Sequence, residues 1–374
     1  MAEEFTRDNP QIRVNVQFMI GDSVEENIKP RIAAGNMPDL VSVNPNAYAA
    51  GLADQGKLID LGETPAWTSM LDSLKPDWTT ASKKHYGVSG GVAATLMYYN
   101  MRLFKQAGIT KPPTNFDEFL KTCEQLKKAG ITPIMWNGGF PNMLGNGPFS
   151  SGFANNIVAN DPRWKIKIRD GTLNLDTPAT ADIFDKIKLV ADRGYVQQGY
   201  MTTNYDAGIK LFTEGHVAMA FHGTWASGLL MHGKNFETGI FMPPWNSPGK
   251  KPVPVIGSET GFAIGATANR QAALQFLEFM MGKGFPILQN KRQSIPPMRA
   301  PQGTMIANSR IAKYIDTISN FAVTSSPYYS FFPAATIDLT HSLLQDVLFK
   351  KRSSREAAAM LNQSIKKEAR GNNK

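Results

Sequence analysis

Short strand patterns alternate with capped helices along this chain, and this alternation constrains the fold more than any other feature. Apolar runs at 39–43, 131–136, 217–221 and 261–266 predict buried strands. At 12–18, apolar and polar residues alternate, which predicts a half-buried strand. Strands that alternate with helices are typical of an α/β fold, so we expect largely parallel sheets.

Helices are marked by the residues that cap them. Thr114 and Asn115 precede a segment whose apolar residues share one face, and Thr177 precedes a proline at the first helical position. Ser353 and Glu356 have the spacing of a capping box and predict a last, basic helix.

The start of the chain lacks one expected element. Residues 2–6 resemble the end of a helix that leads into the strand at 12–18, and a βαβ unit requires a strand before such a helix. We therefore expect that the first strand is missing from this sequence and that the natural protein begins further upstream. Residues 1–4 show neither the basic nor the apolar region of an export signal. No apolar run approaches the ~18 residues that a membrane span needs.

Length, cysteine content and charge exclude several classes of protein. A chain of 374 residues suggests two domains, and its single cysteine, Cys123, excludes a disulfide framework or a cysteine-based zinc cluster. The net charge is +9, but residues 350–374 hold eight basic and two acidic residues and alone carry +6. A basic terminal helix is typically a solvated face, so we do not expect nucleic-acid binding. Attraction to an anionic membrane surface stays open.

Motifs for catalysis or cofactor binding are missing from the sequence. His216 and His222 lie close together but have no third ligand in view, so no metal site is predicted. There is no phosphate-binding loop, and residues 257–261 have the order G-S-x-x-G instead of the G-x-S-x-G of a nucleophile elbow. We expect no catalytic residues and no cofactor. A carbohydrate-active enzyme remains an alternative, because its paired carboxylates need no motif.

Aromatic residues follow several of the predicted strands. Trp136 and Trp225 each come after a strand, and Tyr328 lies in a loop before the terminal helices. In open α/β sheets, ligands bind beyond the carboxyl ends of strands. A flat indole or phenol there suits the apolar face of a sugar ring, while amides and carboxylates bind its hydroxyls.

An ordered series of segments resembles one known family. They are Phe5–Val14, Gly35–Leu40, Tyr86–Val88, Tyr98–Asn100, Pro112–Phe119, Phe212–Met219 and Gly223–Trp225. This series is similar to the extracellular solute-binding proteins of bacterial ABC importers, family 1, the carbohydrate-binding group that includes maltodextrin-binding proteins. The resemblance covers nearly the whole chain.

The resemblance implies a fold of two α/β lobes, the type II periplasmic-binding-protein or venus flytrap fold, joined by several crossing segments. Lobe 1 is then 1–97 and 261–299, and lobe 2 is 98–258 and 300–374. The lobes close on the ligand by a hinge motion, and the ligand favours the closed state.

The implied function is that of the substrate-binding component of an ABC importer. Such a protein captures a neutral mono- or oligosaccharide between its lobes and delivers it to the membrane permease without catalysis. We expect a monomer outside the cytoplasm, either periplasmic or lipid-anchored as a lipoprotein. The alternative within this fold is a charged solute, such as a sugar phosphate or a polyamine.

The resemblance also implies eight ligand-binding positions. One tryptophan, in the motif G-x-W, stacks on the sugar; three polar residues near the P-D-L motif bind hydroxyls, although the aspartate has a turn-capping role as its alternative. One aromatic residue forms a wall before the terminal helices, and three residues lie at strand ends or in a crossing segment, where the arginine has a pinning role as its alternative. The stacking tryptophan is Trp225, the three polar residues are Asn44, Asn46 and Asp39, and the aromatic wall is Tyr328. Trp136 and Glu259 lie at strand ends, and Arg299 lies in a crossing segment.

Overall fold

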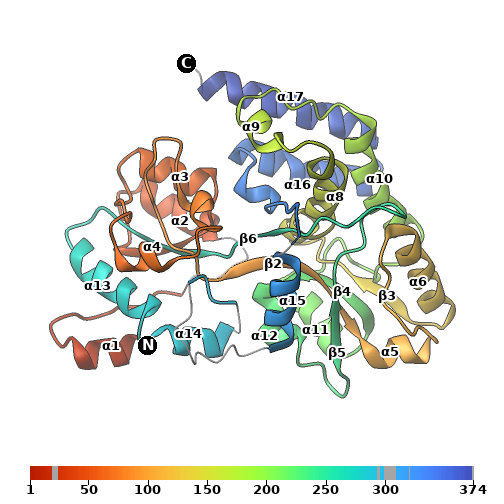
Figure 1. Cartoon of the computed structure of the whole chain (residues 1–374), viewed down its shortest axis with the longest axis horizontal. Coiled ribbons are helices and arrows are strands. Elements are labelled where there is room, and N and C mark those ends of the chain that lie inside the picture. The colour runs from red at the N-terminus through yellow and green to blue at the C-terminus, as the bar shows by residue number, and fades with distance from the viewer. Residues whose placement is uncertain (19–23, 293–294, 299–308, 320, 373–374) are drawn as a thin grey trace. The chain divides into compact units, whose positions relative to one another are not determined.

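The computed structural model describes most of the chain, which divides into two compact units. Unit 1 comprises residues 1–93 and 257–313, and unit 2 comprises residues 94–256 and 314–374. The described residues are 1–18, 24–292, 295–298, 309–319 and 321–372 (Figure 1). The sequence predicted the corresponding changes of lobe at 97/98, 258–261 and 299/300, and the last of these falls outside the described residues.

Unit 1 contains a two-stranded antiparallel sheet in which Leu40 pairs with Ile264 and Val43 with Gly261. Phe5 packs between Phe276 and Phe279, with ring centroids 5.0 and 5.4 Å away. The elements of this unit are α1 (Ala2–Asp8), α2 (Val24–Ala33), β1 (Leu40–Val43), α3 (Ala47–Asp54), α4 (Pro65–Ser69), η1 (Lys75–Trp78), β7 (Gly261–Ile264), α13 (Arg270–Met281) and α14 (Phe285–Arg292).

The strand predicted at 12–18 is not formed, so that prediction is wrong. Val16 is 51% exposed and Phe18 is 90% exposed. A strand needs a neighbour to satisfy its backbone groups, and β1 and β7 pair with each other without including this segment. The alternating pattern describes which side chains could share a face, but it does not supply the partner strand.

Unit 2 is built around a sheet with the strand order β3-β4-β2-β5, in which β6 also pairs with β2. The boundaries between the units fall within three elements, β2 (Val92–Asn100), β6 (Ile256–Ser258) and α15 (Ser309–Ser319). The other elements are α5 (Met101–Gln106), α6 (Phe116–Lys128), β3 (Thr132–Met135), α7 (Asn142–Leu144), the π-helix η2 (Gly145–Phe149), α8 (Ser150–Asn156), η3 (Val158–Asn160), α9 (Trp164–Arg169), α10 (Pro178–Asp192), α11 (Tyr205–Thr213), β4 (Val217–Gly223), η4 (Thr224–Ala226), α12 (Ser227–Leu230), β5 (Thr238–Phe241), η5 (Tyr328–Ser330), α16 (Ala334–Leu348) and α17 (Ser354–Asn372).

The expectation of largely parallel sheets is wrong. β3 and β4 run parallel, whereas β2 is antiparallel to both β4 and β5, and β1 is antiparallel to β7. A parallel direction is required only between strands joined by a crossover connection. β2 and β3 are connected by the helices α5 and α6 but are not neighbours in the sheet, so this connection does not make β2 parallel to the strand beside it.

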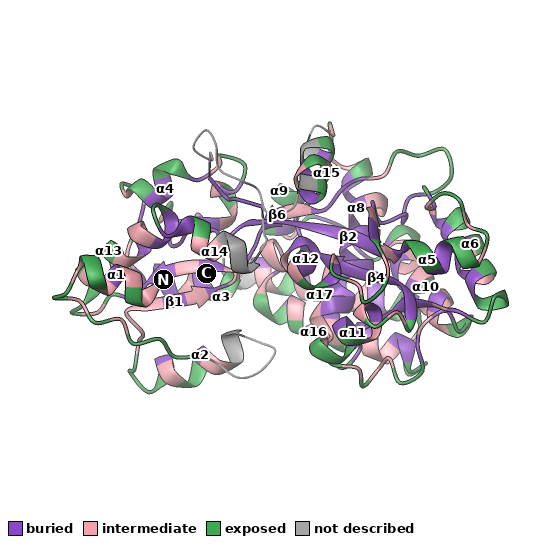
Figure 2. Cartoon of the chain, turned by 90° about the horizontal axis from the view of Figure 1, so that it is seen from below, coloured by how far each residue is buried: buried purple, intermediate pink, exposed green. Residues whose placement is uncertain are grey.

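The predicted helix starts are confirmed in unit 2. Asn115 accepts a hydrogen bond from the Glu118 amide at 3.1 Å, and Thr177 caps α10 in the same way. The apolar face of α6 is buried, and burial raises the pKa of the Cys123 thiol well above its usual value. Figure 2 shows buried residues along the strands and exposed faces on the surrounding helices. The helices thus cover the sheet and leave the ends of its strands for other contacts.

Candidate functional site

Trp225 lies in the turn that follows β4, and its indole is half-exposed. The ring lies directly over Gly223, where an added Cβ would be 1.9 Å from Cζ3 of Trp225. Real Cβ atoms cannot approach so closely, so this position of the indole requires glycine.

Two hydrogen bonds and strand pairing hold this turn. The Ala94 amide donates to the Thr224 hydroxyl oxygen at 3.0 Å, and the Tyr98 hydroxyl donates to the Gly223 carbonyl at 3.0 Å. Gly223 also pairs with Thr95 of β2. Because these partners belong to the sheet, the turn that carries Trp225 is fixed to the sheet of unit 2.

His222 is the residue beneath this turn, and it is completely buried. Its ring centroid lies 5.7 Å from that of Trp225 and 5.1 Å from that of Tyr205. Nδ1 accepts a hydrogen bond from the Gly223 amide at 3.1 Å, while Nε2 is buried without a hydrogen-bond partner in the described part of the chain. Burial lowers the pKa of His222 to about 3, so the imidazole beside Trp225 is neutral at physiological pH.

Asn146 brings a further polar group to the same end of the sheet. The Thr95 hydroxyl donates to the Asn146 carbonyl at 3.1 Å. The side-chain Oδ1 of Asn146 is buried and has no hydrogen-bond partner among the described residues. We call Thr95, Asn146, His222, Gly223 and Trp225 the Trp225 cluster.

The sequence analysis did not identify Asn146 or His222 as members of this group. His222 was considered only as a metal ligand. The available signal for His222 was its position three residues before the tryptophan of G-x-W. For Asn146 the flanking glycines were a sign of close packing, because Gly147 contacts the ring of Phe221.

The structure places Tyr328 inside the core of unit 2. Its ring packs against Gly145, where an added Cβ would lie 2.5 Å from Cζ. Its hydroxyl donates to Oδ1 of Asn142 at 3.2 Å and forms a second, short hydrogen bond with Nε2 of His341. Tyr329, the next residue along the chain, is half-exposed.

Trp136 is also buried, with only 2% of its surface exposed. Gln197 forms hydrogen bonds with both backbone groups of Trp136, accepting from its amide at 2.9 Å and donating to its carbonyl at 2.6 Å. These bonds fix the end of β3. In this structure Trp136 and Tyr328 therefore pack with the core, and Trp225 is the predicted aromatic residue that reaches the surface of unit 2.

In unit 1, the structure brings Asn44 and Glu259 to one end of the β1–β7 sheet. The Thr260 hydroxyl donates to Oδ1 of Asn44 at 2.5 Å. Glu259 is 2% exposed, and its amide donates to the Gly91 carbonyl at 3.0 Å. Asn46 is nearby in sequence, and its side chain caps α3 by accepting from the Ala49 amide at 3.1 Å.

Asp39 lies at the other end of β1. It accepts hydrogen bonds from the Thr267 hydroxyl and from Nδ2 of Asn269, the latter at 3.3 Å. Asn44 lies five positions further along an extended chain, which corresponds to about 16 Å. The structure therefore does not bring Asp39 together with Asn44. Arg299 lies outside the described residues.

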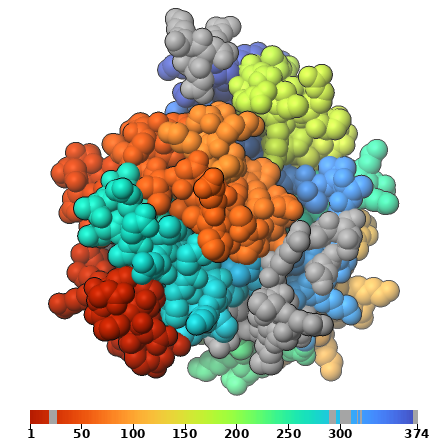
Figure 3. Space-filling model, turned by 60° about the vertical axis from the view of Figure 1, so that its left-hand side comes forward, coloured from red at the N-terminus to blue at the C-terminus, as the bar shows by residue number. Residues whose placement is uncertain are grey.

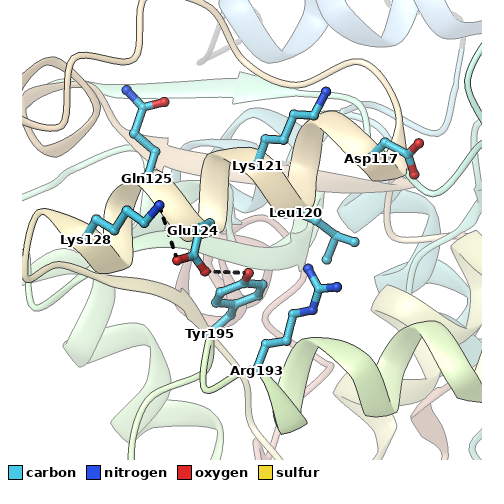
Figure 4. Close-up of a pocket in the computed structure, with 8 residues that line it drawn as sticks. All are labelled: Asp117, Leu120, Lys121, Glu124, Gln125, Lys128, Arg193 and Tyr195. Atoms are coloured by element: carbon cyan, nitrogen blue, oxygen red, sulfur yellow. Dashed lines mark hydrogen bonds and ion pairs between the residues drawn. The ribbon is translucent and has the colours of Figure 1, made fainter.

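A separate surface groove of about 640 Å³ lies along the outer side of α6 (Figure 4). Tyr195 donates a hydrogen bond to Glu124 at 2.9 Å within it, and Lys128 lies 3.8 Å from the same carboxylate. None of the residues that line this groove belongs to the predicted set. It is open and mixed in charge, so it does not indicate a particular ligand.

Within the described residues, no group of three or more His, Cys, Asp or Glu side chains could hold a metal ion. In the same part of the chain, no helix combines the length and apolar character needed to cross a bilayer.

The chain belongs to the family of bacterial extracellular solute-binding proteins, whose family model matches residues 1–284. Among curated proteins, it is 25% identical over 291 residues to the multiple sugar-binding protein of Streptococcus mutans. That alignment covers 75% of this chain and 66% of the relative, just under two thirds of its length. The lactose-binding protein of Rhizobium radiobacter is 24% identical over 308 residues, which cover 77% of this chain and 68% of the relative.

Solved structures establish the fold class. A solute-binding protein called RafE, solved in complex with raffinose, superimposes with a TM-score of 0.81 at 22% identity, over 98% of this chain and 94% of the other. The prediction of a two-lobed α/β fold of the periplasmic-binding-protein type is therefore confirmed.

Proposed function

We propose that this protein is the substrate-binding component of an ABC importer and captures a neutral mono- or oligosaccharide. The observation that carries this proposal is the half-buried indole of Trp225, held over Gly223 with the neutral ring of His222 5.7 Å away. Thr95 and Asn146 add uncharged polar groups at the same end of the sheet. An aromatic face beside uncharged hydrogen-bonding groups suits a sugar ring and its hydroxyls.

The relatives support this choice of ligand class. Two of them are named as sugar-binding and lactose-binding proteins, and the RafE structure contains raffinose. A sugar phosphate or a polyamine is the alternative, but either one needs a charged partner. The side chains of the Trp225 cluster carry no charge at physiological pH, so a neutral sugar is favoured.

In unit 1, we propose that Asn44 and Glu259 provide further hydroxyl contacts from their end of the β1–β7 sheet. Their amide and carboxylate groups are of the kind that binds sugar hydroxyls. Asp39 is better explained as a structural residue, because Thr267 and Asn269 bind both of its carboxylate oxygens.

The wider role follows from the family. We propose that the protein acts outside the cytoplasm as a monomer, delivers its sugar to a membrane permease and does not convert it. A carbohydrate-active enzyme would need two carboxylates beside the sugar, whereas the proposed sugar contacts include one, Glu259.

The proposal is tested by titrating the intrinsic tryptophan fluorescence with raffinose, lactose and maltose, and in parallel with glucose 6-phosphate and putrescine. We expect saturable binding of at least one neutral sugar and no saturation with the charged compounds. Saturation only with a charged compound would contradict the ligand class. Mass spectrometry of the bound sugar after prolonged incubation should return it intact, and cleaved sugar would indicate an enzyme.

A further inference from the structure

The positive charge of the chain is concentrated in two segments that are far apart in sequence. Residues 163–169 contain Arg163, Lys165, Lys167 and Arg169 and no acidic residue. Residues 350–374 contain eight basic and two acidic residues. Together the two segments carry a net charge of +10, compared with +9 for the whole chain, so the rest of the chain is close to neutral.

The structure brings the end of the first segment beside residues 365–369 of the second. Gly171, just after α9, has its Cβ position 2.5 Å from Cβ of Ala369 and 3.6 Å from Cα of Lys366 in α17. Ile168 and Ile365 are buried, so the two helices pack through apolar groups. Figure 1 draws α9 beside α17, and Figure 3 shows the two segments, yellow-green and blue, next to each other on the surface.

The basic side chains of these helices remain on the outside. The only large hydrophobic side chain exposed in α9 is Ile166, which is 43% exposed between two lysines. We define the α9–α17 surface by its exposed residues Arg163, Lys165, Ile166, Arg169, Lys366 and Lys367.

Acidic neighbours neutralise only part of this surface. Asp161 pairs with Lys167 at 2.6 Å, and Asp170 pairs with Arg169 at 2.9 Å. Among the described side chains, no carboxylate lies within ion-pair distance of Lys366 or Lys367. The α9–α17 surface therefore keeps a net positive charge.

We propose that the α9–α17 surface binds the anionic headgroups of a phospholipid membrane. Clustered basic side chains are attracted to anionic lipid, and an apolar side chain among them can enter the interface. Single-stranded nucleic acid is less well matched, because stacking on bases needs exposed aromatic rings and the Trp164 ring of α9 is buried. This proposal does not depend on the sugar or on the Trp225 cluster.

The test is cosedimentation of the full chain with vesicles of phosphatidylglycerol or of phosphatidylcholine. We expect binding to phosphatidylglycerol only, and we expect it to weaken between about 0.1 M and about 1 M salt, where the Debye length falls from about 10 Å to about 3 Å. The variant R163Q/R169Q/K366Q/K367Q should bind at least tenfold more weakly, since each basic residue contributes roughly fivefold near such a surface.

A matched control removes the same number of charges elsewhere in unit 2. K105Q/K111Q/K250Q/K251Q changes four exposed lysines outside α9 and α17, and it should bind vesicles like the unmodified chain. An unchanged urea midpoint in both variants excludes misfolding as the cause. Equal binding to phosphatidylcholine, equal loss in both variants, or no vesicle binding at all would overturn the proposal. Binding to nucleic acid in place of vesicles would also overturn it.

Discussion

The substitution Gly223→Ala tests whether the position of Trp225 depends on the missing side chain. An alanine Cβ would lie 1.9 Å from Cζ3, 2.1 Å from Cη2 and 2.3 Å from Cε3 of the indole. Carbon atoms in contact are about 3.5 Å apart, so the ring must move by roughly 1.6 Å. The backbone at Gly223, with φ −99° and ψ 171°, accepts alanine without strain. The effect therefore comes from the ring alone.

We expect Gly223→Ala to lower the free energy of unfolding by about 1–3 kcal/mol, the usual cost of overpacking. Part of this cost is the contact with His222, because aromatic pairs contribute about 0.5–1.5 kcal/mol. The displaced indole should also weaken sugar binding at least tenfold, which corresponds to about 1.4 kcal/mol.

A double-mutant cycle isolates the steric clash between the alanine Cβ at position 223 and the indole of Trp225. Urea denaturation is measured for the unmodified chain, Gly223→Ala, Trp225→Ala and the double variant, and we expect the cost of Gly223→Ala to disappear once the indole is gone. Gly51→Ala is the control, because nothing lies within 4 Å of its Cβ position in helix α3. An equal cost of Gly223→Ala with and without the indole would refute the argument.

Two further predictions concern stability. Between about pH 6 and pH 5, acid should lower the free energy of unfolding by about 1.4 kcal/mol per pH unit for each of two histidines, and below pH 5 the contribution of His341 should fade as the folded state also binds its proton. Burial lowers the pKa of His222 to about 3 and of His341 to about 4, so above about pH 5 both stay neutral when folded and bind protons only on unfolding. Denaturation of His222→Gln at several pH values should show a shallower slope, and an unchanged slope would exclude this histidine as a cause. Asn46→Ala should cost about 1 kcal/mol in a urea titration because it removes the cap of α3, whereas Asn46→Ser should keep the cap; equal losses in both would argue against capping.

Local signals predicted the individual elements well. The helices that begin after Asn115 and Thr177 depend on caps that lie next to them in sequence. The prediction of a strand at 12–18 was wrong because strand formation needs a partner strand, which the alternating pattern does not specify. The predicted parallel direction was wrong for β2 for a related reason, since it depends on which strand lies beside β2, and that strand is β4 and not β3.

The candidate site was predicted only in part. Trp225 could be identified from a short motif, but the burial of Trp136 depends on Gln197, sixty-one residues away. The burial of Tyr328 likewise depends on the space at Gly145, and the lack of a hydrogen-bond partner for Nε2 of His222 among the described residues depends on the packing around it. Such contacts join distant parts of the chain, so sequence spacing does not reveal them.

The most direct test of the central claim is a calorimetric titration of the neutral sugar that binds most tightly, with the unmodified chain, Trp225→Phe and Trp225→Ala. The account predicts saturable binding that Trp225→Ala weakens at least tenfold, with Trp225→Phe in between because it keeps an aromatic face. Equal affinity in all three proteins would contradict the claim that sugar binds on the indole of Trp225.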